Sequence, residues 1–156
     1  MPTTICNTPA GLIPQELFKE EKIQEYWNVL YPNLYQEFMG IDKLGEFVLL
    51  YPKPKDEETT HEITRMYQTM IEKFPQQTNT IGLYIYENSF SMLAVKDRNV
   101  VFVGFFYFSA DEDIVYHLAH VSHHFFENIS QIKFYYQQLS PKMLHLLNNY
   151  FEMTQL

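Results

Sequence analysis

The sequence predicts an α/β (α+β) protein with a mixed sheet. Residues 80–108 hold three runs with strand patterns, joined by short turns. An amphipathic helical pattern follows, and then a further strand and a further helix. The chain has 156 residues and is 46% hydrophobic, which is enough for one domain or two small ones with a packed core. The second half is therefore expected to have the order β-β-β-α-β-α.

The three strands are predicted from their apolar patterns. Residues 80–86 alternate in the strand period, and residues 90–95 form a second apolar run. The joint between them is short enough for a hairpin, in which Asn88 can take the left-handed conformation at little steric cost. Residues 96–99 form the next turn. Residues 100–108 contain no charged side chain, which predicts a strand covered on both faces.

Two helices are predicted in the second half from their capping residues. Ser109 and Glu112 form a capping box at the start of a helix that ends near Asn128. Its core stripe consists of Ile114, Leu118, Val121 and Phe125. After a strand within residues 130–137, Ser140 and Pro141 begin the last helix.

The hydrophobic patterns that predict helices and strands are weaker in the first half of the chain. Residues 3–13 suit an extended arm or edge strand, and Pro14 is expected in the first turn of a helix that ends near Leu30. The next predicted elements are a short strand at 35–39, a turn at 40–45, a strand at 46–51, a loop at 53–60 and a helix at 63–74. The polar residues 76–80 suggest a boundary, so we expect a partial first half at 1–76 and a second half at 77–156.

Charge and cysteine content limit the functional classes. The formal net charge of −8 disfavours a nucleic-acid partner. One cysteine cannot form an internal disulfide, and no secretory leader is visible, so a cytoplasmic location is expected. The longest charge-free apolar run has nine residues, whereas a membrane-spanning helix needs roughly 20. Membrane insertion is therefore not expected.

Several segments resemble a known bacterial family. Residues 12–18, with the sequence Leu-Ile-Pro-Gln-Glu-Leu-Phe, resemble the opening of the family called domain of unknown function 3822. Residues 48–52, 72–75 and 105–116 resemble later segments of that family. The resemblance implies a ribonuclease H-like, divergent actin-like ATPase fold of two related halves. Members of that family are longer, so this chain is expected to have a shortened first half without its own meander.

The actin-like resemblance directs attention to one hairpin. Nucleotide-binding relatives place an Asp-x-Gly turn between the first two strands of each half. The matching turn here offers Glu87 and Asn88 without a glycine, so side chains hinder the close approach of a phosphate. The candidate nucleotide ligands are Glu87, Asn88 and Asp111. A nuclease using Glu87 and Glu112 is disfavoured, because the fourth strand supplies Lys133 where an acid is needed.

Histidines on one helix form the sharpest candidate metal site. His117, His120 and His124 share a helix face with Asp113, and imidazoles one turn apart can reach one zinc ion. A solvated or interface-lining polar face explains the stripe equally simply. His61 and Glu62 begin a zinc-protease pattern, but Arg65 occupies the second ligand position.

These observations favour a non-catalytic interaction or scaffold protein on a degenerate actin-like fold, with no resident cofactor. The alternative is a residual ATPase or phosphotransferase that holds magnesium through Glu87 and Asp111. Aromatic residues make up 17% of the chain and charged residues only 19%, which favours a homodimer or a protein partner that completes the first half. We expect Phe and Tyr side chains of the first half at that interface.

Overall fold

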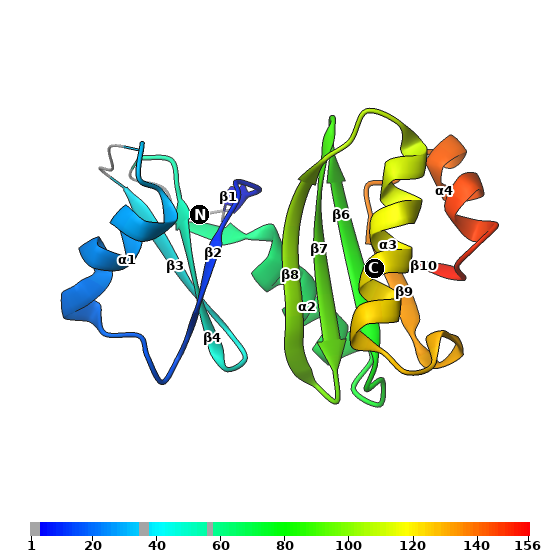
Figure 1. The fold of residues 1–156 in the computed structure, drawn as a ribbon, viewed down its shortest axis with the longest axis horizontal. Helices are drawn as coiled ribbons and strands as arrows, with labels where there is room; N and C mark the ends of the chain where they lie inside the picture. The colour runs from blue at the N-terminus through cyan, green and yellow to red at the C-terminus, as the bar shows by residue number, and fades with distance from the viewer. Residues whose placement is uncertain (1–3, 35–37, 56–57) are drawn as a thin grey trace. The chain divides into compact units, whose positions relative to one another are not determined.

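The computed structural model describes residues 4–34, 38–55 and 58–156 and divides the chain into two compact units (Figure 1). Unit 1 comprises Met1–Arg65 and unit 2 comprises Met66–Leu156. The division falls within one helix, before the polar residues 76–80 at which the sequence suggests a boundary between related halves. The predicted division into two halves at residues 76–80 stays a prediction. Within the described ranges, each helix is too short or too polar to span a membrane.

Unit 2 is built on a mixed five-stranded sheet with the order β10-β9-β6-β7-β8. The strands β6 (Thr80–Tyr86), β7 (Ser89–Lys96) and β8 (Asn99–Tyr107) form an antiparallel meander. Strand β9 (Lys133–Gln137) runs parallel to β6, and β10 (Met153–Gln155) runs parallel to β9. The predicted order β-β-β-α-β-α is confirmed. The sequence did not indicate β10, which has three residues and no buried side chain.

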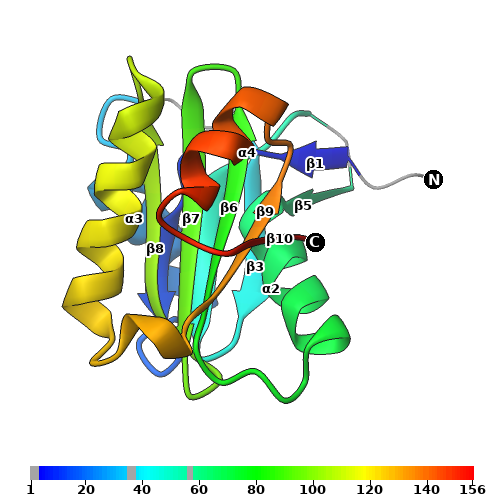
Figure 2. The same cartoon turned by 90° about the vertical axis from the view of Figure 1, so that its right-hand side faces the viewer.

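Two helices, a 3-10 turn and the larger part of helix α2 (Glu62–Lys73) complete unit 2. Helix α3 (Asp111–Phe125) connects β8 to the 3-10 turn η2 (Ile129–Gln131), and α4 (Pro141–Asn148) connects β9 to β10. Figure 2 shows α3 and α4 on the same side of the sheet. As predicted, Ser140 caps α4, because its hydroxyl accepts from the Met143 backbone N–H at 3.2 Å.

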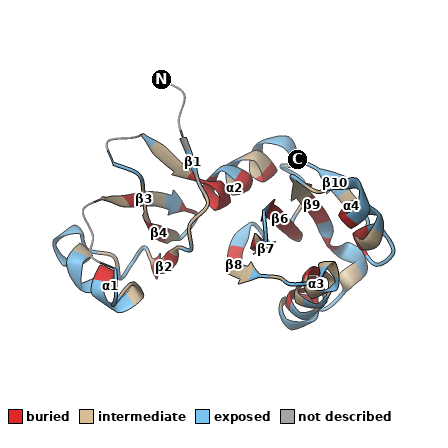
Figure 3. Cartoon of the chain, turned by 90° about the horizontal axis from the view of Figure 1, so that it is seen from above, coloured by how far each residue is buried: buried red, intermediate tan, exposed pale blue. Residues whose placement is uncertain are grey.

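The core of unit 2 lies between the sheet and these helices. Nearly all residues of β6 and β7 are buried, in agreement with their position inside the sheet (Figure 3). Ile114 and Leu118 of α3 are fully buried against them. On the other face, Gly82 leaves room for Met66, whose sulfur would lie 2.6 Å from an added Cβ.

Strand β8 differs from the prediction that it is covered on both faces. It is the edge strand of the sheet, and most of its residues are half-buried. Phe102 and Phe106 pack against the core on the α3 side, while Tyr107 is 76% exposed. The absence of charged residues in this strand therefore reflects an edge strand with aromatic side chains, and not a strand in the middle of the sheet.

The cap of α3 also differs from the predicted box of Ser109 and Glu112. The helix begins one residue later, after Ala110, and Asp113 makes the cap. The Asp113 Oδ2 atom accepts from the backbone N–H groups of Ser109 at 2.9 Å and Ala110 at 3.1 Å. The shift by one residue makes Asp113 the third helical residue, and its carboxylate reaches back to the free N–H groups.

The two hairpin turns of the meander place non-glycine residues at positive φ. In the β6–β7 turn this residue is Glu87, with φ 51°, and not Asn88. In the β7–β8 turn Asp97 and Arg98 have φ values of 49° and 68°. Two consecutive left-handed residues are typical of a type I′ hairpin turn.

Unit 1 contains its own antiparallel sheet. The order is β2-β4-β3, formed by β2 (Gly11–Pro14), β4 (Phe47–Pro52) and β3 (Met39–Leu44). A separate pair is formed by β1 (Thr4–Cys6) and β5 (Thr59–His61), which run parallel. The order β2-β4-β3 is not that of a meander, so the expectation that the first half lacks its own meander stays a prediction. Residues 40–45, predicted as a turn, mostly belong to β3, whereas residues 35–37 of the predicted strand 35–39 lie outside the described residues.

The first helix of the chain is shorter than its pattern suggests. Pro14 ends β2 instead of opening a helix, and the chain then forms the 3-10 turn η1 (Glu20–Lys22) and helix α1 (Ile23–Leu30). Trp27 of α1 is 1% exposed and packs with Ile13 and Leu50. Its indole N–H donates to the Leu34 carbonyl at 3.2 Å. Helix α2 (Glu62–Lys73) follows β5, in agreement with the predicted helix at 63–74.

Candidate functional site

The β6–β7 hairpin lies beside the segment that leads into α3. The Phe108 backbone N–H donates to the Asn88 carbonyl at 2.9 Å, which fixes the turn next to the start of the helix. Glu87 and Asn88 are exposed at the tip of this turn. The structure thus places the predicted hairpin ligands near the helix that begins with the third predicted ligand, Asp111.

Asp111 is engaged by a cation from the neighbouring helix. The Lys142 Nζ atom of α4 lies 2.9 Å from Asp111 Oδ2. The hydrogen bond to Asp111 raises the pKa of Lys142, so the ammonium stays protonated at neutral pH. Magnesium bound at Asp111 would have to compete with this ammonium group.

The first turn of α3 is strongly acidic. Asp111, Glu112 and Asp113 all lie there. The N-terminus of a helix ordinarily favours anions, but three carboxylates at this one repel a phosphate group. The hydrogen bonds from the Ser109 and Ala110 backbone hold the pKa of Asp113 below its ordinary value, which keeps this carboxylate charged.

A groove of about 420 Å³ runs between α3 and β8. Its floor is aromatic, with Phe102 and Phe106 from β8 and Phe125 from α3, and its rim carries the histidines predicted as metal ligands. The lining residues are Phe102, Phe106, Tyr116, His117, His120, Val121, His124 and Phe125. Sequence analysis predicted the histidine stripe but not the groove, because the β8 side chains opposite it belong to a distant segment.

The predicted ligands in this groove have different surroundings. The His117 ring packs on Phe106, with ring centres 4.1 Å apart, and partial burial lowers the pKa of His117. His120 and His124 are exposed, their ring centres are 6.2 Å apart, and the ring planes differ by 17°. Among the described His, Cys, Asp and Glu side chains, no three lie close enough together to hold one metal ion.

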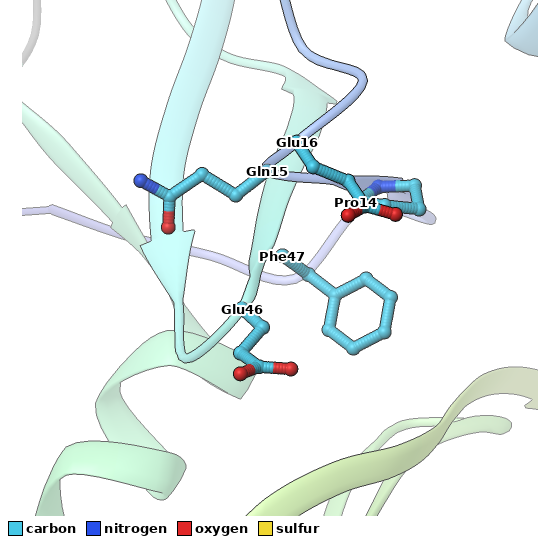
Figure 4. A pocket seen from close by; sticks show the side chains of 5 residues that line it. All are labelled: Pro14, Gln15, Glu16, Glu46 and Phe47. Carbon is cyan, nitrogen blue, oxygen red and sulfur yellow. The ribbon is translucent and has the colours of Figure 1, made fainter.

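A second hollow, of about 690 Å³, lies in unit 1 (Figure 4). It is lined by Pro14, Gln15 and Glu16 at the end of β2 and by Glu46 and Phe47 at the start of β4. The Gln15 backbone N–H donates to the Glu46 carbonyl at 2.8 Å, which joins the two segments. The two exposed carboxylates give this hollow an acidic character that does not favour phosphate.

A buried polar cluster in unit 1 was missed by the sequence analysis. The His61 side chain is fully buried, and its Nε2 atom lies 2.6 Å from the Thr8 carbonyl. Its Nδ1 atom accepts from the Ile63 backbone N–H at 3.2 Å, so Nε2 carries the proton and donates to Thr8. Asp42 accepts from the His61 backbone N–H at 2.8 Å and from the Tyr51 hydroxyl at 3.0 Å.

Burial determines the charge of His61. Desolvation lowers its pKa from 6.5 to about 4, although the Thr8 hydrogen bond and the nearby Asp42 charge act in the opposite direction. His61 is therefore neutral at pH 7, and its 3.6 Å approach to Glu62 Oε2 is not an ion pair there. The cluster joins the segment after β1 to β3, β4, β5 and the start of α2, which indicates a structural role.

Comparisons with known proteins agree with the fold. The model of a family described as "Protein of unknown function (DUF3822)" matches residues 3–151. A solved structure from Bacteroides thetaiotaomicron VPI-5482, described as a protein with actin-like ATPase fold and unknown function, matches with a TM-score of 0.76 and 14% identity. The match covers 97% of this chain and 66% of that chain, so this chain spans just under two thirds of its length. No curated protein matches the sequence.

Proposed function

The chain belongs to the family of proteins of unknown function DUF3822 and has an actin-like ATPase fold, and on this premise we propose that it is a non-catalytic interaction or scaffold protein. The observation that carries this proposal is the 2.9 Å ion pair between Lys142 and Asp111. The Lys142 side chain is 87% exposed, and in this surface ion pair its ammonium group competes with a magnesium nucleotide for the Asp111 carboxylate. A cytoplasmic location remains part of the proposal.

The electrostatics of the hairpin region support the proposal. Glu87, and not a glycine, has the left-handed conformation in the turn, so its side chain projects where a phosphate would approach the backbone. The acidic first turn of α3 adds repulsion between like charges. Binding of ATP at this position would have to overcome both effects.

The alternative is a residual ATPase or phosphotransferase that uses Glu87 and Asp111 with magnesium. One contact favours it, because the hydrogen bond from Phe108 to Asn88 keeps the hairpin and the start of α3 together. Carboxylates from two elements near each other are what a magnesium ion with its waters requires.

A thermal-shift experiment with ATP and magnesium distinguishes the two functions. We expect no change in the melting temperature of the full chain when the nucleotide is added. The variants are Glu87→Ala and Asp111→Ala, with Asp97→Ala in the other hairpin as a matched exposed control. Stabilisation that is lost in both site variants and kept in the control would reject the non-catalytic proposal.

Self-association forms the second part of the proposal. The large hydrophobic side chains that unit 1 exposes among its described residues are aliphatic, including Leu17 at 60% and Val29 at 80% exposure. The contribution of Phe and Tyr side chains of the first half to such an interface stays a prediction. Exposed aromatic residues belong to unit 2, where Tyr107 ends the edge strand β8. Apolar surface of this kind is typical of protein interfaces.

Sedimentation velocity at micromolar concentration tests the association. We expect a symmetric dimer, the commonest closed assembly. Val29→Asp and Tyr107→Asp should show which unit contributes the interface, with Lys19→Asp as an exposed control that removes no apolar surface. A single 18.7 kDa species over the whole concentration range would reject the homodimer.

A further inference from the structure

Two exposed imidazoles on α3 have the geometry of a metal pair. His120 and His124 are four residues apart on a helix of 15 residues, so they lie one above the other on one face. Their ring centres are 6.2 Å apart and their planes nearly parallel. Zinc lies about 2 Å from an imidazole nitrogen, so two rings that share one ion have their centres about 5 to 6 Å apart. A zinc ion lies in the plane of each imidazole that binds it, so the nearly parallel rings have to turn about their side-chain torsions to share one ion.

Neighbouring aromatic rings lie beside both imidazoles. The Tyr116 ring is parallel to that of His120, with centres 6.1 Å apart and planes that differ by 17°. The Phe125 ring meets that of His124 edge-on at 4.7 Å. Both imidazoles remain exposed, so they keep the freedom to turn toward a shared ion.

The surroundings leave the pair accessible to an ion. His117 packs on Phe106, and Asp113 caps the helix, so neither completes a group of three ligands. The net charge of −8 attracts cations to the surface as a whole. An ion bound by two imidazoles keeps open positions, which here lie at the rim of the groove between α3 and β8.

We propose that His120 and His124 bind a divalent late transition metal ion at the rim of the aromatic groove. Imidazole nitrogen suits zinc, nickel and copper, whereas magnesium and calcium prefer oxygen ligands. The proposal does not depend on the scaffold function, because it involves neither Glu87 nor Asp111.

Calorimetry with zinc chloride and the full chain tests the site, and thermal stabilisation by zinc gives a second measurement. We expect about one zinc ion per chain. His120→Ala and His124→Ala should each weaken zinc binding by about tenfold or more. All substituted residues are exposed, so the variants should fold, and the matched control is His123→Ala on the same helix.

Two results would overturn the proposal. One is zinc affinity that is unchanged when both His120 and His124 are replaced by Ala. The other is an equal loss of affinity in His123→Ala. Unchanged affinity in the control together with lost stabilisation in the two site variants would establish the pair as the ligands.

Discussion

His61 acts as the cap of α2 in its neutral form. It immediately precedes the first residue of the helix, and its Nδ1 atom accepts from the Ile63 backbone N–H. A protonated imidazole has no lone pair for this hydrogen bond, and a buried positive charge is costly. Protonation of this one side chain therefore opposes folding of unit 1.

Acidification is expected to destabilise the protein through His61. The pKa falls from 6.5 in the unfolded chain to about 4 in the folded one. Between these values the unfolded state binds more protons, so the free energy of unfolding decreases as the pH falls from 6.5 to about 4. The pKa difference corresponds to roughly 3 kcal/mol.

Urea unfolding at a series of pH values measures this effect. His61→Asn should remove this contribution to the pH dependence, because an amide oxygen can accept from Ile63 without titrating. His145→Asn, at an exposed position on α4, should keep the wild-type slope. A His61→Asn variant that folds and keeps the same slope would contradict the assignment.

The carboxylates at the start of α3 allow a second test at single-residue resolution. Asp113 accepts two backbone hydrogen bonds, whereas Glu112 is the cap that the sequence predicts. Asp113→Ala should lower the melting temperature, and Glu112→Ala should change it less, because only the first leaves the Ser109 and Ala110 N–H groups, just before the helix, without their acceptor. Thermal unfolding followed by circular dichroism measures both, and the reverse order of effects would support the box of Ser109 and Glu112.

At the scale of elements, the β7–β8 hairpin carries backbone strain. Asp97 and Arg98 both have positive φ, a conformation that costs a non-glycine residue about 1 kcal/mol. Arg98→Gly should therefore raise the free energy of unfolding by up to about 1 kcal/mol. Asn99→Gly, at the first position of β8, should lower it by roughly 0.5 kcal/mol. Chemical denaturation compares them, and destabilisation by Arg98→Gly would contradict this interpretation.

The elements differ in how well the sequence predicts them. Apolar periodicity predicts strands β6 and β7 and helix α2 correctly. Each of these elements buries an unbroken row of apolar side chains, so its period is visible in the sequence. Pro14 was misassigned since proline suits both a first helical turn and an edge-strand position. The periodicity of α1 is real, but the helix begins only at Ile23.

The candidate sites also differ in how well the sequence predicts them. Helical spacing predicts that His120 and His124 share a face, because both belong to one element. The His61 cluster depends on Thr8 and Asp42, which are 53 and 19 residues away in the sequence. The ion pair of Asp111 depends on Lys142 of another helix. Contacts between separate elements become visible only once the fold is known.

At the scale of the whole molecule, two compact units share one chain. Each has its own sheet and its own buried cluster, with Trp27 in unit 1 and Ile114 and Leu118 in unit 2. Because each unit has its own buried cluster, the two units can differ in their free energy of unfolding. A single melting temperature would describe the chain only if both units unfold together.

The single tryptophan of the sequence gives unit 1 an optical signal of its own. Trp27 is buried beside Tyr31, with ring centres 4.2 Å apart, so its fluorescence reports the unfolding of unit 1 alone. Far-ultraviolet circular dichroism is dominated by the longer helices, and α3 belongs entirely to unit 2. Under acid conditions that protonate His61, we expect the fluorescence transition to move to lower urea concentration before the dichroism transition does. One intrinsic fluorophore thus makes it possible to follow unit 1 separately from the whole chain, without an added label.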